Sequence, residues 1–378
     1  MIGILRLAFK LLVNDRAKFA ALVAGITFAV FLMVQMTSLF AGILAKSAAT
    51  VTNIGAKIWV MDPLVQTVAN SIPMPDYVLD AVRSIDGVKY AVPLYSGGAL
   101  VKLKSGDYQA VSVIGLDDAS LFGRPLLLKG NIEDIYAENS FFLVKDSEFR
   151  KFEYPDIGTE FELNGHRGVI SGIATVPVSG LFGIPTLYTT YNRAIEYIPQ
   201  SQFTLTYILV EPKSAAVVPY IEQQIAKLGY KGLTLQEFVT AISNFYMFQT
   251  GLGMNIMIMT IISFIVGLSI SAQTFYTFIL ENSQKFGALK AIGAKGYELV
   301  YMILFQATVT AFIGYGLGIG LCVLLISIAK LRIPDYAATI NYANLEIALI
   351  MVIVIAAASG YIGVRRVIKI QPFDIFRS

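Results

Sequence analysis

The sequence predicts an α-helical membrane protein with four transmembrane helices in a 1+3 arrangement and an α+β extracytoplasmic domain inserted between helices 1 and 2. Four long apolar stretches contain no Asp, Lys, Arg or His, and their only Glu is Glu346, at the edge of the last stretch. Each is near or above the roughly 20 residues that a helix needs to cross hydrocarbon. The region between the first two stretches has the mixed composition of a soluble domain. The stretches are 19–44, 251–280, 299–328 and 345–362.

Composition excludes several other classes of protein. Only 15% of the residues are charged, against about 25% in a typical soluble protein. The net charge of +3 is too small to suggest a nucleic-acid partner. The single cysteine, Cys322, cannot form an intrachain disulfide, and the single histidine, His166, cannot form a multi-histidine metal site. No Gly-Lys dipeptide occurs, so the chain has no phosphate-binding P-loop and we expect it to bind no cofactor itself.

Basic residues predict the orientation. Lys and Arg accumulate at the cytoplasmic ends of membrane helices, which places both termini inside and the inserted domain outside. The first apolar stretch is far longer than the 7–15-residue core of a signal peptide, so we expect an uncleaved anchor. The basic clusters are Arg6, Lys10, Arg16 and Lys18, then Lys285, Lys290 and Lys295, and finally Arg365, Arg366, Lys369 and Arg377.

These patterns divide the chain into nine segments in sequence order. They are a cytoplasmic amphipathic segment (1–18), transmembrane helix 1 (19–45), the extracytoplasmic domain (46–250), transmembrane helix 2 (251–280), a short cytoplasmic helix (281–297), transmembrane helix 3 (298–329), a short outer loop (330–344), transmembrane helix 4 (345–363) and a cytoplasmic tail (364–378).

The inserted domain reads as two lobes. Strands are predicted at 88–94, 99–103 and 109–115, with Gly97-Gly98 as a break, and Asn164-Gly165 predicts a hairpin. Helices are predicted at 76–84 and 217–228. The expected division is a porter-like lobe (46–118 plus 201–235), an inserted, mainly β lobe (119–200) and a stalk helix (236–250). No catalytic constellation is recognisable, because His166 lies in the predicted hairpin and has no nucleophile partner.

Two features of this domain leave alternatives open. The stalk helix either continues into 251–280 as one rod or is separated from it by a turn at 251–253. The apolar, Gly- and Pro-rich segment 175–185 is either buried packing or, if Leu181 and Phe182 are exposed, a docking site for a partner.

No Asp, Glu, Lys, Arg or His lies at mid-membrane in these segments, where an ion-coupled carrier needs one, so energy must come from elsewhere if the chain is a transporter. Gln35, Gln273 and Gln306 are expected to form interhelical hydrogen bonds. Gly314/Gly318 and Gly316/Gly320 are two small-xxx-small pairs that allow close helix packing.

The link between the second and third apolar stretches predicts a short amphipathic helix bracketed by Gly287 and Gly293. Phe286, Leu289 and either Ile292 or Gly293 would share one face, which could lie on lipid or fit a groove on a protein partner.

This link resembles the signature of the MacB/FtsX-type ABC permeases. The segment ENSQKFGALKAIGAKGYELVYMILFQA is similar to their pattern E-R-x-x-E-I-G-x-L-K-A-I-G-A, with Lys285 and Phe286 in place of the common Glu and Ile. The C-terminal segment is similar to their closing motif, with Pro372 and Arg377 in matching places. The N-terminal segment is most similar to the DevC-like branch, found in exporters with a membrane-fusion partner.

The resemblance implies a permease subunit in the bacterial inner membrane that transmits motion from a separate ATPase to its outer domain. It implies two ATPase copies holding ATP and Mg²⁺, a second permease chain (a homodimer or a related partner), and a membrane-fusion protein with an outer-membrane channel. It assigns coupling to the ATPase to Glu281, Lys285, Phe286, Gly287, Leu289, Lys290, Ala291, Ile292 and Gly293.

Three functions fit this sequence. The first is export or efflux driven by the partner ATPase, and the size of the inserted domain favours it. The second is FtsX-like regulation of an extracytoplasmic cell-wall hydrolase. The third is a sensor, which the short cytoplasmic segments argue against.

Overall fold

The computed structural model describes residues 2–145, 147–180, 183–198, 205–333 and 336–368. The chain forms two compact units. The first, called the bundle below, comprises Met1–Gly42, Gly253–Arg332 and Ala338–Ser378. The second, called the inserted domain, comprises Ile43–Leu252 and Ile333–Ala337.

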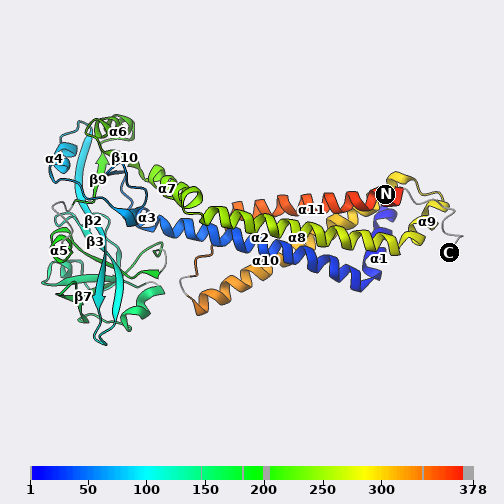
Figure 1. The fold of residues 1–378 in the computed structure, drawn as a ribbon, viewed down its shortest axis with the longest axis horizontal. Coiled ribbons are helices and arrows are strands. Elements are labelled where there is room, and N and C mark those ends of the chain that lie inside the picture. Colours follow the sequence, from blue (N-terminus) through cyan, green and yellow to red (C-terminus); the bar gives the residue numbers. More distant parts are fainter. Residues whose placement is uncertain (1, 146, 181–182, 199–204, 334–335, 369–378) are drawn as a thin grey trace. The chain divides into compact units, whose positions relative to one another are not determined.

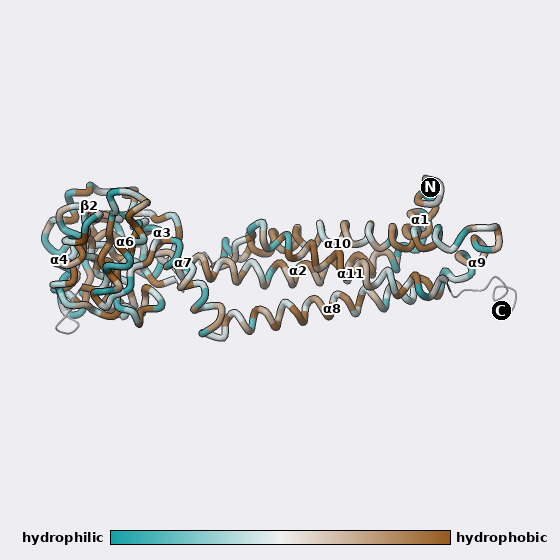
Figure 2. The backbone as a smooth tube through the Cα atoms, turned by 90° about the horizontal axis from the view of Figure 1, so that it is seen from above, coloured by the Kyte–Doolittle hydropathy of each residue, from teal (hydrophilic) through white to brown (hydrophobic). Residues whose placement is uncertain are grey.

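Four helices of the structure are long and apolar enough to cross a membrane, and they run alongside one another in Figures 1 and 2. This confirms the predicted fold class. The helices of the bundle are α1 (Ile2–Asn14), α2 (Arg16–Ser47), α8 (Leu252–Glu281), α9 (Ser283–Ala291), α10 (Gly296–Arg332) and α11 (Tyr342–Ile368), of which α2, α8, α10 and α11 are the long ones.

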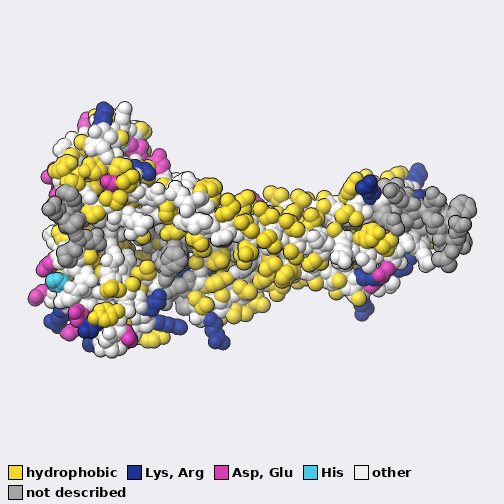
Figure 3. All heavy atoms as spheres, in the orientation of Figure 1, with side chains coloured by type: hydrophobic (Ala, Val, Ile, Leu, Met, Phe, Trp, Pro, Cys, Tyr) yellow, Lys and Arg dark blue, Asp and Glu magenta, His cyan; other side chains and the backbone are white. Residues whose placement is uncertain are grey.

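The longest helix exceeds the thickness of a bilayer core. Helix α10 has 37 residues, which corresponds to about 55 Å at 1.5 Å per residue, against about 30 Å of hydrocarbon. Figure 3 shows hydrophobic side chains along the middle of the bundle and Lys and Arg side chains toward its ends. At least one end of α10 therefore extends beyond the hydrocarbon.

The inserted domain is built on one ten-stranded sheet with the order β10-β1-β9-β2-β3-β8-β5-β7-β4, and β6 pairs with β2 and β7. The strands are β1 (Ile58–Met61), β2 (Val88–Lys102), β3 (Tyr108–Leu116), β4 (Leu126–Lys129), β5 (Ser140–Val144), β6 (Glu160–Leu163), β7 (His166–Thr175), β8 (Thr186–Thr190), β9 (Tyr207–Pro212) and β10 (Lys231–Thr234).

The two predicted lobes share this sheet. Strands β10, β1, β9, β2 and β3 come from the segments assigned to the porter-like lobe, whereas β8, β5, β7, β4 and β6 come from 119–200. Parallel pairing of β3 with β8 joins the halves. One hydrophobic core also spans both, because Trp59 and Tyr207 of the first half and Phe142 of the second belong to it. The segment 119–200 therefore extends the sheet and does not form a separate lobe.

Strand β2 corrects the prediction of a break at Gly97-Gly98. It runs unbroken through both glycines, pairing with β9 up to Leu94 and with β3 from Leu94 onward. A Cβ atom on Gly97 would lie 2.4 Å from the Tyr95 hydroxyl. The glycine therefore makes room for the Tyr95 ring, which is buried.

Helices cover both faces of the first half of the sheet. α4 and α6 enclose a core with β1, β2 and β9 on one face, and α3 and α7 pack on the core that contains Trp59 on the other. The helices are α3 (Ala49–Ile54), α4 (Tyr77–Arg83), α5 (Tyr191–Tyr197), α6 (Val218–Lys227) and α7 (Leu235–Asn244), with short 3₁₀ turns at Val68–Asn70, Ile132–Tyr136, Ser147–Phe152 and Ala215–Val217.

The predicted rod from 236 to 280 is interrupted. Helix α7 ends at Asn244, a π-helical turn follows over Phe245–Gln249, and α8 begins only at Leu252. Between them, Gly251 has φ of +73°, in the left-handed region that ends helices. The continuous helix is therefore wrong and the alternative of a separating turn is correct, although the turn lies at Thr250 and Gly251 and α8 already contains Leu252 and Gly253.

Two carboxyl groups meet at the start of α7. The Thr234 backbone N–H and hydroxyl donate to Glu237 Oε2 at 2.8 and 2.7 Å, and these bonds hold the pKa of Glu237 below its usual value. Oε1 of Glu222, on α6, is buried and has no hydrogen-bond partner within the described residues. Burial and then the charge of Glu237 raise the pKa of Glu222. A proton on Glu222 would give the pair the donor that two carboxylates lack.

We predict that Glu222→Gln stabilises the inserted domain at pH 7–8 but not at acidic pH. A raised pKa means that the folded state binds the Glu222 proton more tightly than the unfolded state does. The stability that this proton contributes is therefore complete below the pKa of Glu222 in the unfolded state, and it is lost as pH rises through the raised pKa of the folded state. The amide donates at every pH. The expected gain is at most about 1 kcal/mol, because the pair is partly solvent-exposed.

The single tryptophan, Trp59, provides the measurement, because it is buried in the domain core and its fluorescence reports unfolding of this unit in the intact chain. Glu133→Gln, at an exposed glutamate of the same domain, is the control. A gain that does not vary with pH would contradict the prediction.

Candidate functional site

The predicted coupling segment forms a helix of its own. Helix α8 ends at Glu281, α9 contains nine residues, and Gly293, with φ of +106°, allows the chain to turn toward α10. At the start of α10, the Lys295 backbone N–H donates to Glu298 Oε2 at 2.8 Å. Gly287 lies inside α9 and is buried, so it does not bracket the helix as predicted.

The predicted apolar face of α9 is divided. Phe286 is 1% exposed and packs inside the bundle, whereas Ile292 is 85% exposed. Ile292 is the C-cap residue, so it already lies in the turn that follows the helix. Ala291 and Gly293 are exposed, and Leu289 is half-buried. A partner at this end of the bundle would therefore meet Ile292 and its neighbours, and Phe286 would support them from within.

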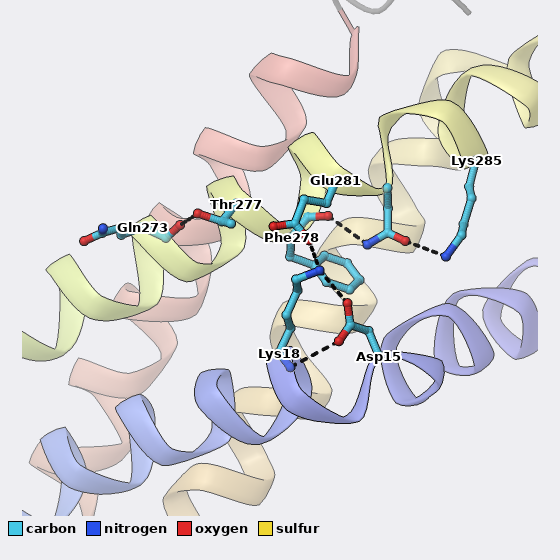
Figure 4. A network of polar contacts seen from close by, with 8 residues as sticks. Asp15, Lys18, Gln273, Thr277, Phe278, Glu281 and Lys285 are labelled. Carbon is cyan, nitrogen blue, oxygen red and sulfur yellow. Dashed lines mark hydrogen bonds and ion pairs between the residues drawn. The ribbon is translucent and has the colours of Figure 1, made fainter. Parts of the chain in front are cut away.

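The remaining members of the predicted set are polar and lie around α9. Glu281 and Lys285 are exposed, and Lys290 is half-buried. Figure 4 shows Glu281 and Lys285 on either side of the α8–α9 junction.

An ion-pair network joins the start of α2 to the end of α8 (Figure 4). Asp15, at the bend between α1 and α2, accepts a hydrogen bond from the Lys18 backbone N–H at 3.3 Å, as an N-cap residue does. Lys18 Nζ lies 2.6 Å from Asp15 Oδ2 and also pairs with Glu281. The hydrogen bond from the Lys18 side chain is the largest of the effects that lower the pKa of Asp15.

Asn282 fixes the junction between α8 and α9. It is 4% exposed. Its Nδ2 donates to the Phe278 carbonyl at 2.9 Å, and its Oδ1 accepts from Lys285 Nζ at 2.8 Å. Lys285 and Glu281 belong to the predicted coupling set, whereas Lys18 was predicted only as part of a basic cluster, and Asp15 and Asn282 were not predicted. Only the N-cap preference of Asp15 could have indicated one of them.

The two glycine pairs of α10 lie on different faces of the helix. A Cβ atom on Gly314 would lie 2.6 Å from Ile26 Cγ2, and one on Gly318 would lie 2.6 Å from Val30 Cβ. These two glycines therefore allow α2 to approach α10 closely. Among the described residues, no atom outside the adjoining backbone of α10 lies within 4 Å of a Cβ built on Gly316 or Gly320, so this second pair faces open space.

A further close contact was not predicted. A Cβ atom on Gly25 of α2 would lie 2.6 Å from Ile270 of α8, and one on Gly267 would lie 2.2 Å from Ala29. The signal was present in the sequence as small residues four positions apart, Gly25 and Ala29 on one helix and Gly267 and Ser271 on the other.

The predicted docking residues Leu181 and Phe182 lie outside the described residues, as do Pro372 and Arg377. The described beginning of the apolar segment is held by α3. Asn53 Nδ2 donates to the Val178 carbonyl at 2.7 Å, and the Val178 N–H donates to Asn53 Oδ1 at 3.1 Å. Within the described ranges, no cluster of three or more His, Cys, Asp or Glu could hold a metal ion.

We predict that Gly318→Ala destabilises the bundle by about 1–3 kcal/mol, the usual cost of overpacking. The matched change Gly320→Ala, on the same helix, should be neutral or slightly stabilising because its Cβ meets nothing. The measurement is the labelling rate of Cys322, the single and buried thiol, during thermal or denaturant unfolding. Equal effects of the two changes would show that α2 does not approach α10 as described.

We also predict that Lys18→Gln and Glu281→Gln are coupled. Their double-mutant cycle should give an interaction of at most about 1 kcal/mol, as expected for a partly exposed pair. Lys285→Gln combined with Glu281→Gln should be additive, because Lys285 bonds to Asn282. The same Cys322 labelling assay measures both cycles. Additivity of the Lys18 and Glu281 changes would rule out the ion pair.

Two family models match the chain. The MacB-like periplasmic core domain matches residues 19–228, and the FtsX-like permease C-terminal model matches residues 236–372. HrtB of Staphylococcus epidermidis, which its name assigns to a hemin transport system, is 23% identical over 265 residues, covering 67% of this chain and 73% of HrtB. An uncharacterized ABC transporter permease of Mycobacterium tuberculosis is 24% identical over 345 residues, covering 90% of each chain.

Two solved structures are similar to about half of this chain at low sequence identity. The extracellular domain of YknZ from Gram-positive bacteria is 13% identical, with a TM-score of 0.37, and covers 47% of this chain and 99% of that one. The periplasmic region of MacB from Actinobacillus actinomycetemcomitans is 12% identical, with a TM-score of 0.37, and covers 51% and 96%. Since the first family model alone matches more than half of the sequence, this chain belongs to the MacB/FtsX-type family of ABC transporter permeases.

Proposed function

We propose that this chain is the permease subunit of an ABC-type export complex, in which α9 receives motion from a separate ATPase and the bundle transmits that motion to the inserted domain. In this proposal the ATPase holds ATP and Mg²⁺, and the permease contributes mechanical coupling. Both termini and α9 are cytoplasmic, as the basic residues around them favour, and the inserted domain works on the other side of the bacterial inner membrane.

The joining of α2 to α8 is the observation that carries the proposal. These are the two helices whose chain leads directly into and out of the main part of the inserted domain, Ile43–Leu252. Lys18 and Glu281 tie them together next to α9, and Gly25 and Gly267 bring their backbones close further along. A displacement of α9 would therefore act on both helices at once.

The chain connections at the two ends of Ile43–Leu252 differ in stiffness. On one side, α3 begins at Ala49, separated by one residue from the end of α2 at Ser47, and Asn53 of α3 donates to the Val178 carbonyl in the apolar segment 175–185. On the other side, the π-helical turn and Gly251 interrupt the path from α8 to α7. In this proposal α2 acts as the stiff lever, while the connection at Gly251 bends.

The complete assembly is part of the proposal. Two ATPase copies and a second permease copy would complete the transporter, and the open face of α10 at Gly316 and Gly320 is available for packing against another helix. A membrane-fusion protein and an outer-membrane channel would continue the pathway beyond the inner membrane.

We predict that Ile292→Asp weakens co-purification with the partner ATPase at least about tenfold, as expected when a charge is placed in the centre of an interface. Because Ile292 is 85% exposed, the change should leave the fold intact. The matched control is Ile333→Asp, at an exposed isoleucine beyond the other end of α10. Folding of both variants is checked by Trp59 fluorescence and Cys322 protection.

Undiminished binding by the Ile292 variant would remove the proposed ATPase contact. Transport assays in vesicles with the intact complex then test the export step. Loss of ATP-dependent efflux in the Ile292 variant supports it, whereas a complex that hydrolyses ATP and moves no solute would point instead to regulation of an extracytoplasmic partner.

A further inference from the structure

Helix α1 is not collinear with α2, the first membrane helix, because the chain bends where α2 begins. The bend lies at Asp15, which caps α2, and Figures 1 and 2 both show α1 running across the direction of the long helices. Only one residue separates α1 from α2. Chain connectivity therefore keeps α1 at the surface of the membrane, because the helix that follows it crosses the hydrocarbon.

One side of α1 is held by the bundle. Ala8 and Leu12 are fully buried. Gln306 of α10, also fully buried, donates through Nε2 to the Ala8 carbonyl at 2.8 Å. A glutamine inside a membrane bundle that bonds to another helix resists separation of the two, since its amide would otherwise be left in hydrocarbon. The contact fixes which way α1 faces.

The opposite side of α1 is basic. Arg6 and Lys10 are one turn apart and both exposed, and Arg6 lies about 200° around the helix from Ala8. Residues 2–14 contain no Asp or Glu, and neither basic side chain has an ion-pair partner among the described residues. Leu7 and Phe9, which flank the basic side, are 38% and 45% exposed.

This arrangement is that of a helix lying in the membrane interface, with apolar side chains toward the acyl chains and basic ones among the headgroups. We propose that α1 binds anionic phospholipid through Arg6 and Lys10, and that Gln306 links the lipid-bound helix to α10. Charge complementarity selects anionic over zwitterionic lipid, and direct continuity with α2 selects the membrane over an acidic protein. The inference does not depend on the transport function proposed above.

The test follows the depth of α1 in the full chain. A spin label is attached at Gly3→Cys in a Cys322→Ser background, since nothing lies within 4 Å of a Cβ on Gly3. The protein is placed in nanodiscs of phosphatidylcholine alone or with phosphatidylglycerol. Collisions with a water-soluble relaxation agent report the exposure of α1. Each basic residue near an anionic surface changes the binding equilibrium about fivefold, so the label should be clearly less accessible in the anionic discs.

The matched variants decide which charges act. Arg6→Gln with Lys10→Gln should abolish the difference between the two lipids, as should high salt. Lys330→Gln with Arg332→Gln, which removes the same charge at the other end of α10, should preserve it. Equal accessibility in both lipids, or a difference that survives loss of Arg6 and Lys10, overturns the proposal. Protection by inorganic phosphate in phosphatidylcholine discs would assign the site to free phosphate and overturn the lipid assignment.

Gln306→Leu tests the link to α10. It should increase the mobility of the label in either lipid, because α1 loses its bond to the bundle, while the accessibility difference between the lipids remains. Unchanged mobility would overturn the role of Gln306. Trp59 fluorescence and thermal unfolding establish that each variant is folded.

Discussion

Close backbone approach of α2 to its neighbours is the constraint on which the bundle depends. Lipid tails are as apolar as leucine, so helix association in a membrane relies on packing and on polar contacts between helices. Gly25 and Gly267 permit the approach of α2 to α8, and Gly314 and Gly318 permit that of α2 to α10. Helix α2 is thereby fixed against both, and every polar contact at its ends depends on this register.

Polar contacts secure the register at each level of the bundle. Near α9, Lys18 joins α2 to α8. Gln306 joins α10 to α1. Further along α2, Gln35 accepts a hydrogen bond from Cys322 of α10 at 3.4 Å. A slip of α2 by one turn would break the first and the last of these contacts together, so the location of α9 is set by helices that do not contain it.

The sequence alone predicted those features of the fold that depend on residues close together in the chain. The absence of charge identified the four membrane helices, and Asn164-Gly165 identified a hairpin whose two turn residues have φ of 49° and 87°. Tertiary contacts decided the rest. Helical spacing predicted that Phe286, Leu289 and either Ile292 or Gly293 share one face, but the helix ends before Ile292, and of these residues only Phe286 is buried. Lys18 and Glu281 are too far apart in the chain for any local pattern to pair them. In the sequence Gly97 resembles a turn residue, but in the structure it lies inside β2 and leaves room for the ring of Tyr95.

The long strand β2 determines how the inserted domain responds to force. It belongs to both halves of the sheet, paired with β9 along its first part and with β3 along its second. Hydrogen bonds between antiparallel strands lie perpendicular to the strand axis. A pull along β2 therefore loads many of these hydrogen bonds in shear at the same time. They would have to break together, because this direction of force does not open them one by one. Along the direction of β2, the domain should therefore behave under tension as one stiff unit, so that a pull at one end of this strand is shared by both halves of the sheet.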